Sequence, residues 1–211
     1  MGRRPRLLAL VLLGAAGSTG GLVAQVRGLP VRNAGIGTGI GIAADIGFPN
    51  GDAGKGVAFG ASGQIGLGPL GVSAIVAHWD PSGLSPAINS VGGTANLKIF
   101  GGPLIPVSVT LQAGAAYNKQ GASNHWEIPL GVGLALTIPN PVFSIKPWVA
   151  PRLQISGDSP DESHFGVSAG IDLGFINGIS LRAMYDRVEA GHGLHPSIVS
   201  VGAGYGIRLH L

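Results

Sequence analysis

The sequence has no cysteine among its 211 residues. Disulfide bonds and thiolate metal sites are therefore excluded. Charged residues make up only 11% of the chain and aromatic residues only 6%. A chain with so few charges fits neither a disordered segment nor an ordinary soluble domain, in which about 25% of residues are charged.

Long apolar runs are also missing beyond the N-terminus. No such run approaches the roughly 20 consecutive apolar residues that a transmembrane helix needs, so a helical membrane protein is disfavoured. The chain nevertheless has 38 glycines, 15 prolines and a positive mean hydropathy. Something other than water must solvate this apolar surface.

The first 24 residues have the pattern of a secretory signal peptide. A basic start with Arg3, Arg4 and Arg6 precedes an apolar stretch and a small, glycine-rich segment that leads to Ala24. We expect cleavage after Ala24. An uncleaved membrane anchor is the alternative, and it is disfavoured because the apolar stretch is too short to span a bilayer.

Cleavage would leave residues 25–34 as a short periplasmic segment and residues 35–211 as the folded domain. Without the three N-terminal arginines, ten basic residues balance ten acidic ones. The high isoelectric point therefore belongs to the precursor, and no nucleic-acid partner is expected.

The stretch GIGTGIGIAADIGF, residues 35–48, has isoleucine, threonine, alanine or phenylalanine at even positions and mostly glycine at odd ones. Such alternation predicts a strand whose two faces meet different environments. The pattern recurs, and the predicted strands are residues 35–48, 55–67, 70–79, 88–100, 106–118, 124–138, 142–155, 164–175, 178–187 and 198–211. The segment 142–155 is the weakest of them because Pro147 and Pro151 lack the N–H that a ladder requires.

The connections between these segments alternate in length. Short links at 68–69, 101–105, 139–141 and 177–178 alternate with longer, more polar links at 49–54, 80–87, 119–123, 157–163 and 190–196. Transmembrane barrels alternate short periplasmic turns with longer extracellular loops. The alternative, a soluble β-sandwich, would carry lysine and glutamate on the solvent-exposed faces of its sheets. We therefore predict an all-β, up-and-down antiparallel transmembrane β-barrel of about ten strands, with eight as the alternative number.

Aromatic residues occupy outward-facing alternate positions of the predicted strands, near the strand ends. They are Phe48, Tyr117, Trp126, Phe165 and Tyr185 at the loop side, with Phe143 and Phe175 at the turn side. Such girdles mark the two interfaces of a membrane.

With the last strand VSVGAGYGIRLHL, these features resemble the small bacterial outer-membrane barrels, the class that includes the OmpA-, OmpX- and OmpW-like families. The resemblance covers residues 35–211. It implies a location in a bacterial outer membrane and contact with outer-membrane lipid. It also implies recognition of the C-terminal strand by the barrel-assembly machinery, although this chain ends in Leu211 where the class usually has phenylalanine.

In an up-and-down barrel the first and last strands pair, which predicts a glycine seam. The expected seam places Gly37, Gly39 and Gly41 beside Gly202, Gly204 and Gly206. These glycines either receive bulky inward side chains such as Trp148 and Arg152, or line a narrow water path. The packed lumen is favoured because small barrels are normally filled.

The inward-facing alternate positions of the predicted strands carry a set of mostly polar residues with five positive and four negative charges. Its members are Asp45, Gln64, Lys98, Gln112, Glu127, Lys146, Trp148, Arg152, Asp172, Arg182, Asp186 and Arg208. Buried charges need partners, so a salt-bridge network across the lumen is favoured over a polar pore lining.

Histidines are the candidates for chemistry, and five of them map to the loop-side rim. They are His78, His125, His164, His192 and His195. No HExxH motif or tight HxH pair fixes a ligand geometry, so we expect no metal, no cofactor and no catalytic residues. The expected role is structural, or that of a minor porin-like path for small solutes. The alternatives are a rim-site hydrolase of envelope lipid or peptide, and surface recognition through the loops.

Overall fold

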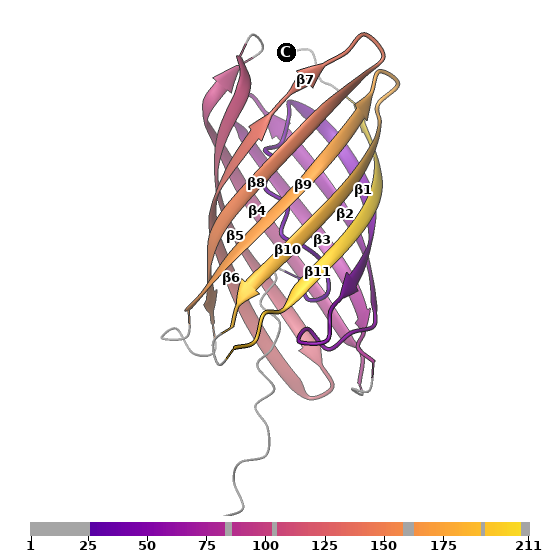
Figure 1. Ribbon diagram of the computed structural model, residues 1–211, viewed down its shortest axis with the longest axis vertical. Coiled ribbons are helices and arrows are strands. Elements are labelled where there is room, and N and C mark those ends of the chain that lie inside the picture. The colour runs from indigo at the N-terminus through magenta and orange to yellow at the C-terminus, as the bar shows by residue number, and fades with distance from the viewer. Residues whose placement is uncertain (1–25, 83–85, 103–104, 158–162, 191–192, 208–211) are drawn as a thin grey trace, which may run out of the picture.

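A computed structural model describes residues 26–82, 86–102, 105–157, 163–190 and 193–207. These residues form one antiparallel sheet (Figure 1). Its strands are β1 (Gly39–Pro49), β2 (Val57–Leu67), β3 (Leu70–Asp80), β4 (Ile88–Gly102), β5 (Ile105–Gln120), β6 (Ser123–Leu136), β7 (Ile138–Pro139), β8 (Phe143–Ser156), β9 (Ser163–Phe175), β10 (Ile179–Glu189) and β11 (Ser197–Ile207). No helix in the described part of the chain is long and apolar enough to cross a membrane.

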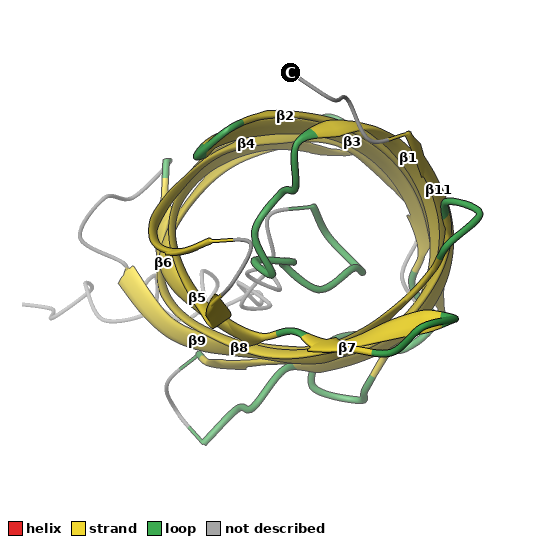
Figure 2. Cartoon of the chain, turned by 90° about the horizontal axis from the view of Figure 1, so that it is seen from above, coloured by secondary structure: helices red, strands yellow, loops and turns green. Residues whose placement is uncertain are grey.

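The sheet closes on itself into a barrel. Each long strand pairs with its neighbours in the sequence, β6 pairs with β8, and β1 pairs with β11. Figure 2 shows the resulting ring from one end. Ten long strands confirm the predicted number, and the eight-strand alternative is wrong. The two-residue β7 is an addition that pairs only with β8.

Two details differ from the predicted strands and connections. The link expected at 119–123 as a longer loop is a tight turn at Gly121, because β5 and β6 continue pairing up to Gln120 and Ser123. The segment with two prolines does form β8. Its ladder with β6 is interrupted between the pairs Gly131–Arg152 and Leu134–Val149, and Pro151, which cannot donate to a ladder, lies within this gap.

The outer face of the barrel is apolar and the inner face is buried. Along the strands exposed and buried residues alternate, with Ile42 66% exposed and Phe59 54% exposed on the outer face. On the inner face Gln154, Ser168 and Ser200 are fully buried. An outer surface of this kind requires an apolar solvent, and the closed ring leaves no edge strand unpaired in it.

Residues 26–38, hereafter the lumen segment, lie inside the ring (indigo in Figure 1). Gly28 lies against Trp79 near the end that carries the long loops, hereafter the loop end. Ile36 lies against Gly71 near the end that carries the short turns, hereafter the turn end. The chain then enters the barrel wall at Gly39.

The lumen segment changes two expectations. Residues 26–34 were expected as a periplasmic segment ahead of the barrel, but they lie within the lumen, where Val26, Leu29 and Ala34 are each 1% exposed. The first strand was expected from residue 35 and begins at residue 39. The signal peptide predicted for residues 1–24 lies outside the described residues.

Candidate functional site: the barrel lumen

Among the described residues, four ion pairs cross the interior of the barrel. All four acidic residues of the predicted inward set take part, and each is paired with an arginine. The pairs are Arg27–Glu127 at 3.5 Å, Arg32–Asp172, Arg152–Asp186 at 2.7 Å and Arg182–Asp45. Two of the arginines, Arg27 and Arg32, belong to the lumen segment. The charges therefore tie this segment to the barrel wall.

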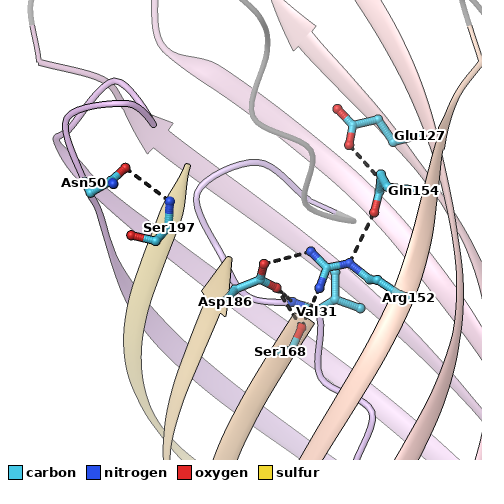
Figure 3. A network of polar contacts seen from close by, with 8 residues as sticks. All are labelled: Val31, Asn50, Glu127, Arg152, Gln154, Ser168, Asp186 and Ser197. Carbon is cyan, nitrogen blue, oxygen red and sulfur yellow. Dashed lines mark hydrogen bonds and ion pairs between the residues drawn. The ribbon is translucent and has the colours of Figure 1, made fainter. Parts of the chain in front are cut away.

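The best-satisfied of these pairs is centred on Arg152 (Figure 3). Its guanidinium donates to Asp186 Oδ1 and to Ser168 Oγ, both at 2.7 Å, and to Gln154 Oε1 at 3.4 Å. Ser168 in turn donates to Asp186 Oδ2 at 2.8 Å, and Gln154 donates to Glu127 at 3.1 Å. A buried ion pair is stable only when such additional hydrogen bonds satisfy its remaining donors and acceptors, and this network meets that condition.

The backbone of the lumen segment is held by side chains of the wall. Three hydrogen bonds do this, from both sides of the barrel. They are Val31 N–H to Asp186 Oδ2 at 3.0 Å, Arg27 N–H to Asn118 Oδ1 at 3.2 Å, and Gln112 Nε2–H to the carbonyl of Arg32 at 2.9 Å. Because irregular backbone inside a barrel has no ladder to pair with, such side-chain partners are what satisfies it.

Glycines on the inner face make the room that the lumen segment occupies. An added Cβ would come closer to this segment than real Cβ atoms do at five wall positions. These are Gly133 (2.1 Å from the carbonyl oxygen of Asn33), Gly47 (2.2 Å from that of Gly28), Gly66 (2.2 Å from that of Gly37), Gly60 (2.3 Å from Leu29 Cδ1) and Gly71 (2.6 Å from Ile36 Cβ). These glycines on the inner face of the barrel wall thus leave the space that the lumen segment fills.

Other inner glycines receive the bulky side chains expected from the sequence. An added Cβ at Gly170 would lie 2.8 Å from the ring of Trp148, and one at Gly166 would lie 3.0 Å from Arg152 Cζ. Trp148 is 4% exposed, and its Nε1–H points at Asp172 Oδ1 at 3.4 Å.

An apolar cluster closes the loop end of the lumen. Val26 and Leu29 of the lumen segment pack with wall residues that include Trp79 and Ile88, each 2% exposed. The indole of Trp79 donates to the carbonyl of Lys55 at 2.9 Å. Sequence reasoning missed this cluster, although Trp79 stands on an inward column of its strand and could have been noticed there.

The turn end of the lumen is more open. A cavity of about 100 Å³ lies between the lumen segment and the wall, and Lys98, Lys146, Ser108 and Thr137 line it. Lys98 also borders a wider opening at the same end, whose inward-facing residues include Arg32, Gln64, Asp172 and Arg182. Arg208, the last member of the predicted inward set, lies outside the described residues.

The glycine seam has a different register from the one expected. Gly41 does pair with Gly206, but Gly204 lies opposite Ala43, and Gly202 lies opposite Asp45. Gly39 begins the first strand, and Gly37 belongs to the lumen segment. Gly202 leaves room for the Asp45 side chain. An added Cβ there would overlap Asp45 Oδ1 and displace its ion pair with Arg182.

The four rim histidines within the described ranges come from β3, β6, β9 and the residues just before β11. His78 bonds to Asn89 at 2.9 Å and His195 pairs with Glu189 at 2.7 Å, whereas His125 and His164 stand on inward columns of β6 and β9. Within the described ranges no group of three histidine, aspartate or glutamate side chains could hold a metal ion. His192 lies outside those ranges.

The aromatic residues of the predicted girdles lie on the outer face near strand ends. Phe48, Trp126, Phe165 and Tyr185 are between 43% and 51% exposed. Tyr117 packs against Trp126 at the loop end with ring centroids 5.1 Å apart, and Phe143 packs against Phe175 at the turn end at 6.5 Å.

No protein-family model and no curated protein sequence matches the chain. Solved structures do match. The β-domain of the Bordetella autotransporter BrkA aligns with 79% of this chain and 98% of its own at 11% identity and a TM-score of 0.50. The N-terminal barrel of Pseudomonas aeruginosa OprF covers 81% and 98% at 14% identity and 0.42, and the KdgM porin 80% and 99% at 10% and 0.45. With its ring closed by the β1–β11 and β6–β8 pairings, this chain has the ten-strand antiparallel barrel fold of bacterial outer-membrane β-barrel proteins.

Proposed function

We propose that this chain is an integral outer-membrane barrel whose lumen is closed by its own lumen segment, so that its role is structural rather than conductive. The observation that carries the proposal is the occupied lumen. The segment lies between Trp79 at the loop end and Gly71 at the turn end, anchored by two ion pairs and seated on wall glycines. A porin requires a continuous water path, and a lumen occupied in this way supports the proposal of a closed one.

In the proposed orientation, the turn end faces the periplasm and the loop end faces the outside. Short periplasmic turns and longer outer loops are the rule for bacterial barrels. Residues 1–24 would direct export as a signal peptide. The apolar outer face would contact outer-membrane lipid, and the C-terminal strand β11 would be recognised by the barrel-assembly machinery.

We propose further that the barrel is not an enzyme. At the rim, His78 bonds to Asn89 and His195 pairs with Glu189. Neither arrangement contains a nucleophile with its base. A hydrolytic activity on envelope lipid or peptide that disappears in His125→Ala or His164→Ala would contradict this proposal.

Conductance in a planar bilayer tests the closed lumen. The refolded wild-type protein is expected to give no discrete steady openings. Deletion of residues 26–33 removes Leu29, Arg27 and Arg32 from the lumen and is expected to produce openings. Steady openings of the wild-type protein would overturn the proposal.

A second measurement covers the case in which the deletion does not fold. The chain has no native cysteine, so single cysteines can be labelled cleanly. Ala34→Cys, at a position 1% exposed, is expected to resist a water-soluble maleimide in the folded barrel. Gly37→Cys, four residues before Gly41 and with nothing within 4 Å of its added Cβ, is the matched control and is expected to react. Equal labelling of both would show that the segment does not stay in the lumen.

A further inference from the structure

The charges of the lumen do not cancel. The four inward carboxylates are all paired with arginines, which leaves Lys98 and Lys146 without an acid of their own. In the part of the chain that the structure describes, no carboxylate forms an ion pair with either lysine. Asp172 lies opposite Lys146 in the β8–β9 ladder, but its carboxylate pairs with Arg32 and accepts a hydrogen bond from Trp148.

The two lysines meet at one cavity although they come from different parts of the wall. Lys98 is on β4 and Lys146 is on β8, and both line the cavity of about 100 Å³ at the turn end. The wall between them contributes two hydroxyl-bearing residues, Ser108 and Thr137. Residues 34–37 line the cavity from the lumen side.

We propose that this cavity is a binding site for a small oxyanion, a phosphate or a carboxylate, held between Lys98 and Lys146. Each lysine supplies a positive charge with three N–H donors, and lysine binds phosphate in proteins as a point charge. The Ser108 and Thr137 hydroxyls add neutral donors. The cavity has room for several water-sized groups, which suits an anion of four or five heavy atoms.

The position of the cavity favours a free solute over a lipid headgroup. It lies on the inner face of the barrel, whereas lipid would meet the outer face. It is also at the turn end, away from the apolar cluster that closes the loop end. In the proposed orientation the bound anion would therefore come from the periplasm.

Calorimetric titration with inorganic phosphate tests the site. The refolded full chain is used in an uncharged detergent at low salt, where the attraction between exposed charges is least screened. Wild-type protein is expected to bind phosphate saturably at one site. The double variant Lys98→Gln/Lys146→Gln is expected to bind at least tenfold more weakly. Lys119→Gln, which removes an exposed lysine at the loop end of β5, is the matched control and is expected to bind as the wild type does.

A folding check, a charge-conserving variant and a lipid competition complete the test. Heat-modifiable gel migration checks that each variant is folded, and Lys98→Arg/Lys146→Arg, which keeps both charges, is expected to retain binding even if the glutamine variant does not fold. Absence of saturable binding in the wild type, or equal loss in Lys119→Gln, would overturn the site. Competition by added phosphatidylglycerol would also overturn it, because the ligand would then be a lipid headgroup. None of these readouts depends on conductance, so the site and the closed lumen can fail separately.

Discussion

Asp186 shows how one buried carboxylate can organise both the wall and the interior. Its two oxygens accept hydrogen bonds from Arg152, from Ser168 and from the backbone N–H of Val31. The first two partners belong to β8 and β9, and the third to the lumen segment. Loss of this carboxylate would leave a buried arginine without its charge partner and would release the middle of the segment.

We therefore expect Asp186→Ala to lower the free energy of unfolding by about 3–5 kcal/mol, the range typical for breaking a buried ion pair from one side. The adjacent residue provides the control. Arg187 forms an exposed pair with Glu189, with both side chains between 45% and 49% exposed, and Arg187→Ala should cost about 0–1 kcal/mol. Urea unfolding of the refolded barrels in lipid vesicles measures both values. Similar costs for the two variants would contradict the buried network.

Residues of the inner columns could be found from the sequence, but not all of their partners. Alternation along the strands placed Asp45, Arg152 and Asp186 on the inner face, and each has an arginine or aspartate partner there. Arg27 and Arg32 could not be identified in this way. They lie in residues 26–34, ahead of the alternating stretch, so no periodic signal tells where their side chains point.

At the level of elements, the lumen segment and the wall are fitted to one another through glycine. Gly133 on β6 is the tightest of these contacts, because an added Cβ would lie 2.1 Å from the backbone carbonyl of Asn33. Backbone cannot move aside as the end of a flexible side chain can. Either the segment or the strand must shift.

Gly133→Ala is therefore expected to destabilise the barrel by about 1–3 kcal/mol, as overpacking of a tight interior does. Gly63→Ala is the control, since it lies on β2 with nothing within 4 Å of its added Cβ. Its effect should be near zero or slightly stabilising, because alanine restricts the unfolded chain. Urea unfolding again gives both values, and a neutral Gly133→Ala would mean that the segment does not press on β6.

The strands could be predicted from the sequence because each has two faces in different environments, and period 2 records that difference directly. The lumen segment could not, because it satisfies its backbone through side chains of distant strands such as Gln112 and Asp186. A usable signal did exist. The inner columns of the first three strands carry glycines at 47, 60, 66 and 71, which leaves space that some other part of the chain must fill.

At the scale of the whole molecule, the barrel is apolar outside and polar inside, the reverse of a soluble protein. This arrangement makes the cost of an outward charge depend on its depth in the membrane. Two outward positions on β2 differ in depth and share the same face. Ala61 lies near the middle of the strand, and Val57 is its first residue at the loop end.

Ala61→Arg is expected to cost about 2–4 kcal/mol and Val57→Arg about 0–1 kcal/mol when unfolding is measured from lipid vesicles. The difference arises because an arginine at the middle of the bilayer has no water within reach. Equal costs at the two positions would argue that the outer face does not lie in a membrane.

The β1–β11 pairing joins the first and last long strands of the chain, and the lumen segment is attached directly to β1. From this connectivity we expect an order of events during assembly. Contacts so distant in the sequence form slowly, so the ring shuts late. A lumen segment that was still outside the barrel at that stage would have to pass into a closed ring lined with charged groups. The interior must therefore be in place while the sheet is still an open, curling ribbon, and the final zipping of β11 onto β1 encloses it.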